Sequence, residues 1–264
     1  MFERGLYRTR LAETAADLRE AQRLRHLAFR ARAGAAGAHG GQGVGGAAGA
    51  DGAAGGLDAD DFDALCTHFL VEERAGGRLV CCFRLLALGD GRAIGRSYSA
   101  QFYELSALSG FAGPMAELGR FCIRPGLRDP DILRAAWAAL TRHVDANGIE
   151  MLFGCSSFPG TDAAPYTDVF ALLGERHLAP RRWRVRVKAP AVVRFARRLR
   201  RYKPDMRLAM RRMPPLLRSY LAMGGWVSDH AVVDADMNTL HVFTGLEIAA
   251  MPPARKRLLR VLAG

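Results

Sequence analysis

The chain has 264 residues, and half of them are hydrophobic, which is enough to form a core in one large domain or two small ones. It contains no run of 18 apolar residues and no apolar signal core at its N-terminus, so we expect neither a spanning helix nor secretion. The five cysteines form no C-x-x-C pair, so the sequence suggests neither a zinc site nor a disulfide framework. We expect a cytoplasmic protein with reduced thiols and no metal.

Most of the net charge lies in one segment. The chain has 38 basic and 26 acidic residues, a formal net charge of +12. Residues 181–218 hold fifteen Lys or Arg and a single acid, Asp205, so this segment alone carries +14 and the rest of the chain −2. Such a segment favours an anionic partner: nucleic acid, an anionic membrane or an acidic protein. Nucleic acid is not favoured, because no helix-turn-helix, RNP or zinc-finger pattern is present.

The first hundred residues predict a helix, an insertion and a hairpin. Residues 11–32 carry apolar side chains three or four apart, which predicts a helix. Residues 33–56 are almost all Gly and Ala, and we expect a disordered insertion there. Two apolar runs, 67–72 and 79–88, flank Gly76-Gly77 and predict a β-hairpin.

The middle of the chain predicts a βαβ unit. Residues 115–124 have strand composition and end at Pro125-Gly126. A helix is predicted over 131–146, because Asp129-Pro130-Asp131 is a strong helix start and Asn147-Gly148 a typical end. The apolar residues 150–155 predict the next strand. A strand, a helix and a strand of these lengths are typical of two parallel strands with a crossover.

The basic segment contains two predicted elements. Residues 182–187 alternate Arg with Trp or Val, which predicts a strand with one apolar face. Residues 191–202 predict an amphipathic helix with Phe195 on its apolar face and arginines on the other. Two interpretations fit this helix: it packs on the domain with a solvated basic face, or it lies on an anionic membrane. We expect a core over residues 1–190 and a basic segment, 191–264, that completes the domain.

The stretch Glu117-Leu118-Gly119-Arg120-Phe121-Cys122-Ile123 places two charges in a predicted sheet core. Strict alternation puts Glu117 and Arg120 on opposite faces, and a bulge would bring them closer. Charges are seldom buried unless they are paired or used in function. A buried ion pair that fixes the strand register and a functional pair remain equal alternatives at this point.

A resemblance starts from this stretch. Glu117-Leu118-Gly119-Arg120-Phe121 resembles the corresponding strand of acyl-homoserine-lactone synthases and of bacterial ornithine N-acyltransferases, both members of the GNAT-type acyltransferase superfamily. Other motifs resemble the synthases in the same order: Leu24-Arg25-His26-Leu27-Ala28-Phe29, Asp60-Asp61-Phe62-Asp63 and Arg84-Leu85-Leu86. Beyond residue 120 the ornithine acyltransferases fit better, over residues 129–134, 152–161 and 213–218.

The resemblance implies an α/β fold with a mixed sheet, in which two central parallel strands splay apart around the phosphopantetheine arm of the acyl donor, and a basic helical C-terminal extension. It also implies site residues. Glu117 is the candidate base or amine holder, with Arg120 beside it. The implied substrate-binding residues are Arg25, Phe29, Asp60, Asp63, Arg84, Ser156 and Ser157. Asp60 and Asp63 have an ordinary alternative as a helix N-cap and a solvated acid.

The loop from Arg124 to Pro130 is where the phosphate of the donor is expected. It has a single glycine, Gly126, two prolines that lack N–H donors, and an aspartate that repels phosphate. Coenzyme A carries a pyrophosphate that needs several amides, whereas an acyl carrier protein carries a single phosphate. Arg124 and Arg128 are expected to meet that phosphate. We therefore expect acyl carrier protein as donor and no other cofactor.

Together these observations and the resemblance predict an N-acyltransferase. It would move a 3-hydroxyacyl chain from acyl carrier protein to the α-amine of L-ornithine, giving lyso-ornithine lipid at the inner face of the cytoplasmic membrane, with residues 191–212 on the anionic lipid surface. One alternative is an acyl-homoserine-lactone synthase that uses S-adenosylmethionine. The other is a non-catalytic basic module that binds a membrane or nucleic acid.

Overall fold

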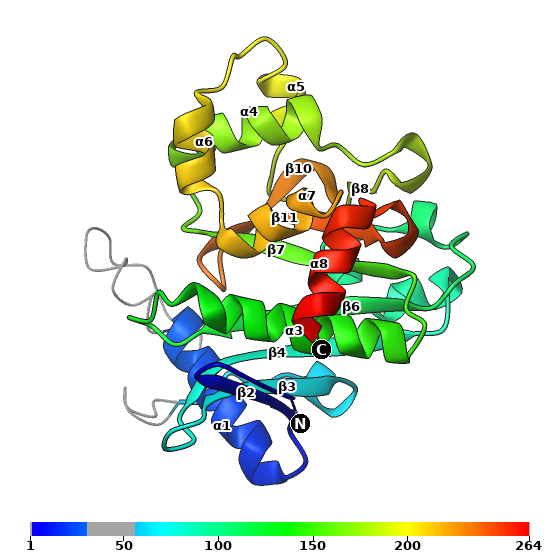
Figure 1. Cartoon of the computed structure of the whole chain (residues 1–264). Helices are drawn as coiled ribbons and strands as arrows, with labels where there is room; N and C mark the ends of the chain where they lie inside the picture. The colour runs from blue at the N-terminus through cyan, green and yellow to red at the C-terminus, as the bar shows by residue number, and fades with distance from the viewer. Residues whose placement is uncertain (1, 31–55, 264) are drawn as a thin grey trace. The chain divides into compact units, whose positions relative to one another are not determined.

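The computed structural model describes residues 2–30 and 56–263. The chain divides into two compact units, one of residues 1–84 and 120–139 and the other of residues 85–119 and 140–264. None of the helices in the described part of the chain combines the length and the hydrophobicity that a bilayer-spanning segment needs. The strands (Figure 1) are β1 (Phe2–Arg4), β2 (Tyr7–Leu11), β3 (Thr67–Glu73), β4 (Leu79–Leu88), β5 (Tyr103–Glu104), β6 (Met115–Ile123), β7 (Met151–Pro159), β8 (Arg186–Val187), β9 (Val192–Val193), β10 (Trp226–Asp234) and β11 (Thr239–Glu247).

The α-helices are α1 (Ala15–Arg25), α3 (Pro130–Ala146), α4 (Thr167–Arg176), α5 (Phe195–Arg198), α6 (Met206–Arg212), α7 (Pro215–Ala222) and α8 (Pro253–Ala263). Short helical turns join them. Those used below are the π-helical turn η1 (His26–Arg30) and the 3₁₀ turns η2 (Asp61–Ala64), η3 (Gly91–Arg96), η4 (Ser99–Gln101) and η7 (Arg181–Trp183).

The first unit is a sheet with the strand order β1-β2-β3-β4-β6, where β4 and β6 run on into the second unit. Strands β2 and β3 are antiparallel, with Tyr7 opposite Glu73 and Leu11 opposite Phe69. Helix α1 and the turn η1 pack on this sheet through a buried cluster, made of Ala21, Leu24, Ala28, Leu70, Leu79, Cys82 and Cys122. The predicted strands at 67–72 and 79–88 are confirmed.

The helix predicted over residues 11–32 is only partly correct. Leu11 ends β2, and α1 begins at Ala15, because Thr14 and Asp17 form a reciprocal capping box. The helix then widens at His26 into the π-helical turn η1. The insertion predicted at residues 33–56 lies, except for Gly56, outside the described residues.

The second unit has the strand order β4-β6-β7-β11-β10-β9. Strands β6 and β7 are parallel, as predicted, but their registered pairs end at Glu117 and Phe153. Next to this point Gly154 has φ +154°, and a Cβ placed on it would lie 2.4 Å from the carbonyl oxygen of Leu118. Only glycine fits this approach without a backbone shift. Strand β7 is then paired antiparallel along its whole length with β11.

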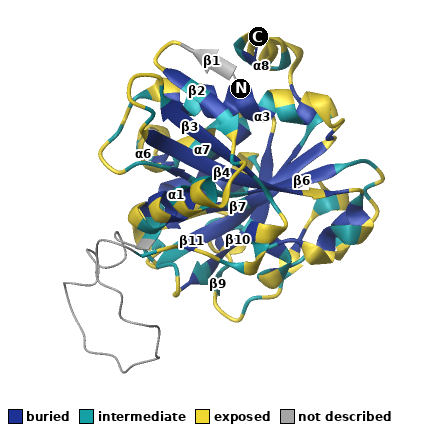
Figure 2. Ribbon diagram, turned by 90° about the horizontal axis from the view of Figure 1, so that it is seen from below, coloured by how far each residue is buried: buried dark blue, intermediate teal, exposed yellow. Residues whose placement is uncertain are grey.

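Helices α4 to α7 cover one face of the second unit's sheet. Their buried side chains meet Phe158 of β7 and Leu240 of β11 in one hydrophobic cluster. Figure 2 shows strands β7, β10 and β11 as buried, with exposed residues along the helices. Phe195 lies at the centre of this cluster, fully buried and stacked on Phe170 with ring centroids 5.1 Å apart.

The prediction of an amphipathic helix over residues 191–202 is wrong. Val192 and Val193 instead form β9, which pairs antiparallel with Val232 and Ala231 of β10. Only the four residues of α5 are helical. The reason is tertiary: the edge of β10 offers hydrogen bonds to two β-branched residues, and this outweighs the helical spacing of the arginines.

The strand predicted over 182–187 is also mostly wrong, because η7 is a 3₁₀ turn and only the two residues of β8 form a strand. The βαβ prediction is confirmed by β6, α3 and β7. Helix α3 begins at Pro130, and the Asp129 carboxylate accepts the N–H of Asp131 at 2.9 Å. The division at residue 190 stays a prediction.

Candidate active site

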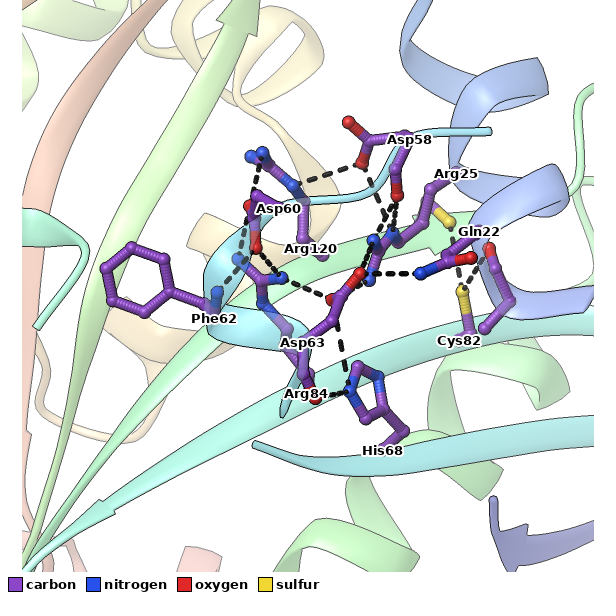
Figure 3. Close-up of polar contacts among 12 residues, drawn as sticks. Gln22, Arg25, Asp58, Asp60, Phe62, Asp63, His68, Cys82, Arg84 and Arg120 are labelled. Atoms are coloured by element: carbon purple, nitrogen blue, oxygen red, sulfur yellow. Dashed lines mark hydrogen bonds and ion pairs between the residues drawn. The ribbon is translucent and has the colours of Figure 1, made fainter. Parts of the chain in front are cut away.

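Three arginines and three aspartates form a closed network in the first unit (Figure 3). The arginines come from three elements: Arg25 ends α1, Arg84 lies on β4 and Arg120 on β6. The aspartates, Asp58, Asp60 and Asp63, lie in and just before the turn η2. The six formal charges cancel, which allows the group to be buried without a net charge.

Asp63 is the centre of the network. Its two carboxylate oxygens accept hydrogen bonds from both terminal nitrogens of Arg25, each at 2.7 Å. Arg84 Nη1 donates to the same carboxylate at 2.5 Å, and Gln22 Nε2 donates to it at 2.9 Å. Burial raises the pKa of Asp63, but the two guanidinium groups outweigh it and hold this pKa well below its usual range. Asp63 is therefore charged and saturated with donors.

Asp60 and Arg120 form the more exposed side of the network. The side chain of Asp60 is 23% exposed and that of Arg120 13%, whereas Arg25 is 1% exposed. Arg84 binds Asp60 through two parallel bonds of 2.5 and 2.8 Å, and Arg120 Nη2 donates to Asp60 at 2.9 Å. Burial acts against the charge of Asp60, but Arg84 and Arg120 still lower its pKa. Arg120 Nε also lies 3.1 Å from the Asp58 carboxylate.

Local conformation builds this geometry. Asp60 is the N-cap of η2 and accepts the N–H of Phe62, which is the capping role considered for it from the sequence. Arg120 has a left-handed backbone, with φ +52°, inside β6. Such a residue is strained, and it breaks the strict alternation expected for this strand. The Arg84 guanidinium lies over the ring of Phe62, with its Cζ atom 5.6 Å from the ring centroid.

Glu117 lies in the second unit, buried on β6 at the last registered pair with β7. Its carboxylate accepts the N–H groups of Tyr98 and Ser99, both at 2.7 Å, and the Ser99 hydroxyl at 2.5 Å. The Ser99 Oγ also lies 3.4 Å from the sulfur of Cys155 on β7. Glu117 thus fixes the start of η4 beside the point where β6 and β7 part.

The register of β7 sorts its polar residues onto two faces. Cys155 and Ser157 alternate with Ser156 and lie on the face of Phe153, the partner of Glu117. Ser156 is buried on the other face, where its hydroxyl accepts a bond of 2.9 Å from Thr244. Ser157 is exposed. Both serines were predicted to bind substrate, but they lie on opposite faces of β7.

A buried polar cluster of the second unit was not predicted. The Tyr103 hydroxyl donates to the carbonyl oxygen of His241 at 2.8 Å and lies 3.1 Å from its Nδ1. His230 is fully buried, with its ring centroid 5.3 Å from that of Tyr103. Burial lowers the pKa of His241 to about 4, so its ring is neutral.

The loop after β6 holds the residues predicted for the donor phosphate. Arg124 Nε donates to the carbonyl oxygen of Leu79 at 2.8 Å, and Gly126 has a left-handed φ of +87°. Arg128 is exposed. Asp129 occupies the N-terminus of α3 and also accepts the Tyr7 hydroxyl at 2.7 Å. A carboxylate already takes the helix end where a phosphate is usually bound, which is consistent with the departure seen in the sequence.

Sequence reasoning missed several residues of these clusters. Asp58 and Gln22 were not predicted. Asp58 could have been found, because it lies in the same acidic run as Asp60 and Asp63, which were predicted. Ser99 lies eighteen residues before Glu117, and only the folded chain brings them together. Phe29 lies in η1, half-buried against the core cluster of the first unit.

Comparison with known proteins places the chain in a family. The model of the acetyltransferase (GNAT) domain matches residues 24–138. The L-ornithine N(alpha)-acyltransferase of Rhodobacter capsulatus is 34% identical over 252 residues, covering 93% of this chain and 91% of the relative. The enzyme of the same name from Brucella abortus is 28% identical, covering 92% and 85%. Among solved structures, FeeM, an N-acyl amino acid synthase from uncultured soil microbes, is 11% identical over 97% of this chain and 96% of that one, with a TM-score of 0.45. The chain is an acyltransferase and belongs to the family of the L-ornithine N(alpha)-acyltransferases.

Proposed function

We propose that this enzyme transfers a 3-hydroxyacyl group from acyl carrier protein to the α-amine of L-ornithine, giving lyso-ornithine lipid. The acceptor is supported by similarity over more than nine tenths of the chain to two relatives named L-ornithine N(alpha)-acyltransferase. In the transfer, the thioester C–S bond breaks, an amide C–N bond forms, and the carrier's thiol leaves with a proton. The amine must first lose a proton, because it is an ammonium at neutral pH.

Glu117 is the group we propose to accept this proton, by way of the Ser99 hydroxyl or a water molecule. The support is its position at the last paired residues of β6 and β7, and its 2.5 Å bond from Ser99 Oγ. A hydroxyl between an ammonium and a carboxylate can accept a proton from the ammonium while it gives its own proton to the carboxylate. The two backbone N–H groups keep the carboxylate in place for this role.

In the first unit we propose that Asp60 and Arg120 recognise the charged groups of ornithine. They are the more exposed members of the network, and each is oriented by a partner that is more deeply buried. Asp63 and Arg25 hold the turn η2 in place through bidentate bonds. A direct contact of Asp63, Arg25, Phe29 or Arg84 with substrate stays a prediction.

For the donor, we propose that the basic segment of residues 181–218 receives the carrier protein. Its arginines are exposed, and on α6 the side chains of Met206 and Met210, each followed directly by an arginine, are 38% and 39% exposed. Exposed methionine among cations suits an acidic protein with an apolar contact surface. The continuous amphipathic helix expected to lie on lipid is not formed here, so the carrier protein is the better partner for this segment.

The test of the chemistry is a comparison of Glu117→Gln with Glu175→Gln, a control on the exposed surface of α4. We expect Glu117→Gln to lower kcat by about 100-fold or more, the usual effect of removing a general base. The control should keep the wild-type rate. If Glu117→Gln is folded by circular dichroism and transfers at the wild-type rate, the role given to Glu117 is wrong.

A further inference from the structure

Helix α8 presents an exposed apolar stripe that the reaction does not use. Ala254, Leu258 and Val261 follow one another at spacings of four and three residues, so they lie on one side of the helix. Leu258 is 48% exposed and Val261 71%, among the highest values for large apolar residues in the described chain. The opposite side is turned inward, with Ala263 buried.

The stripe is bordered by cations. Helix α8 contains Arg255, Lys256, Arg257 and Arg260 and no acidic residue. By helical position, Arg257 lies on one side of the stripe and Arg255 on the other. Arg260 links the helix to α3, because it binds the Asp145 carboxylate through two bonds of 2.9 and 3.0 Å. The apolar stripe thus lies between two exposed arginines, on a helix that a third arginine joins to α3.

We infer that α8 lies on an anionic lipid bilayer, with Leu258 and Val261 in the boundary between headgroups and acyl chains. A helix of eleven residues is about 16 Å long, enough to lie in the interface but far too short to span the membrane. The long stems of Arg255 and Arg257 allow their charges to reach lipid phosphates while the apolar side chains enter the bilayer. This surface is distinct in sequence from the segment of residues 181–218 proposed for the carrier protein.

The inference deepens the proposed function, whose amphiphilic product belongs in a bilayer, but its test needs no turnover. The test is co-flotation of the whole chain with phosphatidylcholine vesicles. The vesicles contain roughly 0, 20 or 40% phosphatidylglycerol, so that their negative surface charge increases stepwise. We expect binding that rises with phosphatidylglycerol and falls with salt. No flotation of the wild-type protein with any vesicle overturns the inference, whether or not the enzyme acylates ornithine.

Two double variants identify the helix. Leu258→Ser with Val261→Ser should lower the partition coefficient by about tenfold or more, from lost apolar burial. Arg255→Glu with Arg257→Glu should lower it by about 25-fold or more, at about fivefold per cation near an anionic surface. The matched controls are Leu65→Ser, whose leucine is 58% exposed in the first unit, and Arg19→Glu with Arg23→Glu on α1. The controls should float as the wild type does.

A final pair of measurements separates lipid from protein. The α8 variants should bind acyl carrier protein as the wild type does, while Arg207→Glu with Arg211→Glu on α6 should float normally and bind the carrier poorly. If the α8 variants float normally and lose the carrier protein, α8 docks an acidic protein and the lipid assignment is overturned.

Discussion

Replacement of Asp63 by Asn tests whether the arginine–aspartate network holds the first unit together. The change leaves the shape of the side chain but removes its charge, so the two buried guanidiniums of Arg25 and Arg84 lose their shared counter-ion. Breaking a buried pair in this way costs about 3–5 kcal/mol. The N–H₂ group of Asn would also face donors, because Gln22 Nε2 now donates to the Asp63 carboxylate. We expect the free energy of unfolding to fall by about 4 kcal/mol.

The assay is urea denaturation followed by circular dichroism, with Asp61→Asn as the control. Asp61 is exposed and only two residues away, so its replacement should change the free energy of unfolding by less than about 0.5 kcal/mol. For Asp63→Asn the midpoint should fall by more than about 1 M urea. Equal midpoints for the two variants would refute the argument that the network is a buried, charged unit.

The same change has a predicted pH dependence. The pKa of Asp63 is lower in the folded protein than its ordinary value of about 3.9. A lowered pKa contributes stability that is fully present above the unfolded value and is lost as pH falls towards the folded one. The stability difference between the wild type and Asp63→Asn should therefore be constant above about pH 5 and shrink on acidification below about pH 4. A difference that grows with acidity would contradict the charge assignment.

Three further predictions concern the second unit. Gly154→Ala should destabilise the protein by about 1–3 kcal/mol, because the added methyl meets the Leu118 carbonyl oxygen, while Gly95→Ala, with nothing within 4 Å, should be close to neutral in thermal denaturation. Arg207→Glu with Arg211→Glu should raise KM for acyl carrier protein by about tenfold at low salt and leave KM for ornithine unchanged; equal effects on both would contradict the docking role. Ser99→Ala should lower kcat and change its pH profile if the hydroxyl passes a proton to Glu117, and an unchanged profile would leave Ser99 a purely structural role.

The elements predicted best are those with a local cause. Strands β3 and β4 are apolar runs around Gly76-Gly77, and α3 starts at an acidic residue followed by proline. The element predicted worst, residues 191–202, depends on a distant partner, because Val192 finds its hydrogen bonds on β10. No spacing within that segment reveals this edge.

The same division applies to the candidate site. Asp60, Asp63, Arg25, Arg84 and Arg120 were named from motifs, and the structure brings all five into one network. The contacts of Glu117 were not foreseen, since they come from the turn at η4, which has no motif of its own. A motif indicates that a residue matters, but tertiary structure determines what it touches.

The most direct test of the central claim is mass spectrometry of a reaction that contains the purified protein, 3-hydroxyacyl carrier protein and L-ornithine. We predict a product with the mass of ornithine plus the 3-hydroxy acid minus water, and its loss in Glu117→Gln. No product with ornithine, together with transfer to S-adenosylmethionine and release of a lactone, would contradict the proposed acceptor. A carrier protein that stays acylated with every amine offered would contradict the proposed reaction itself.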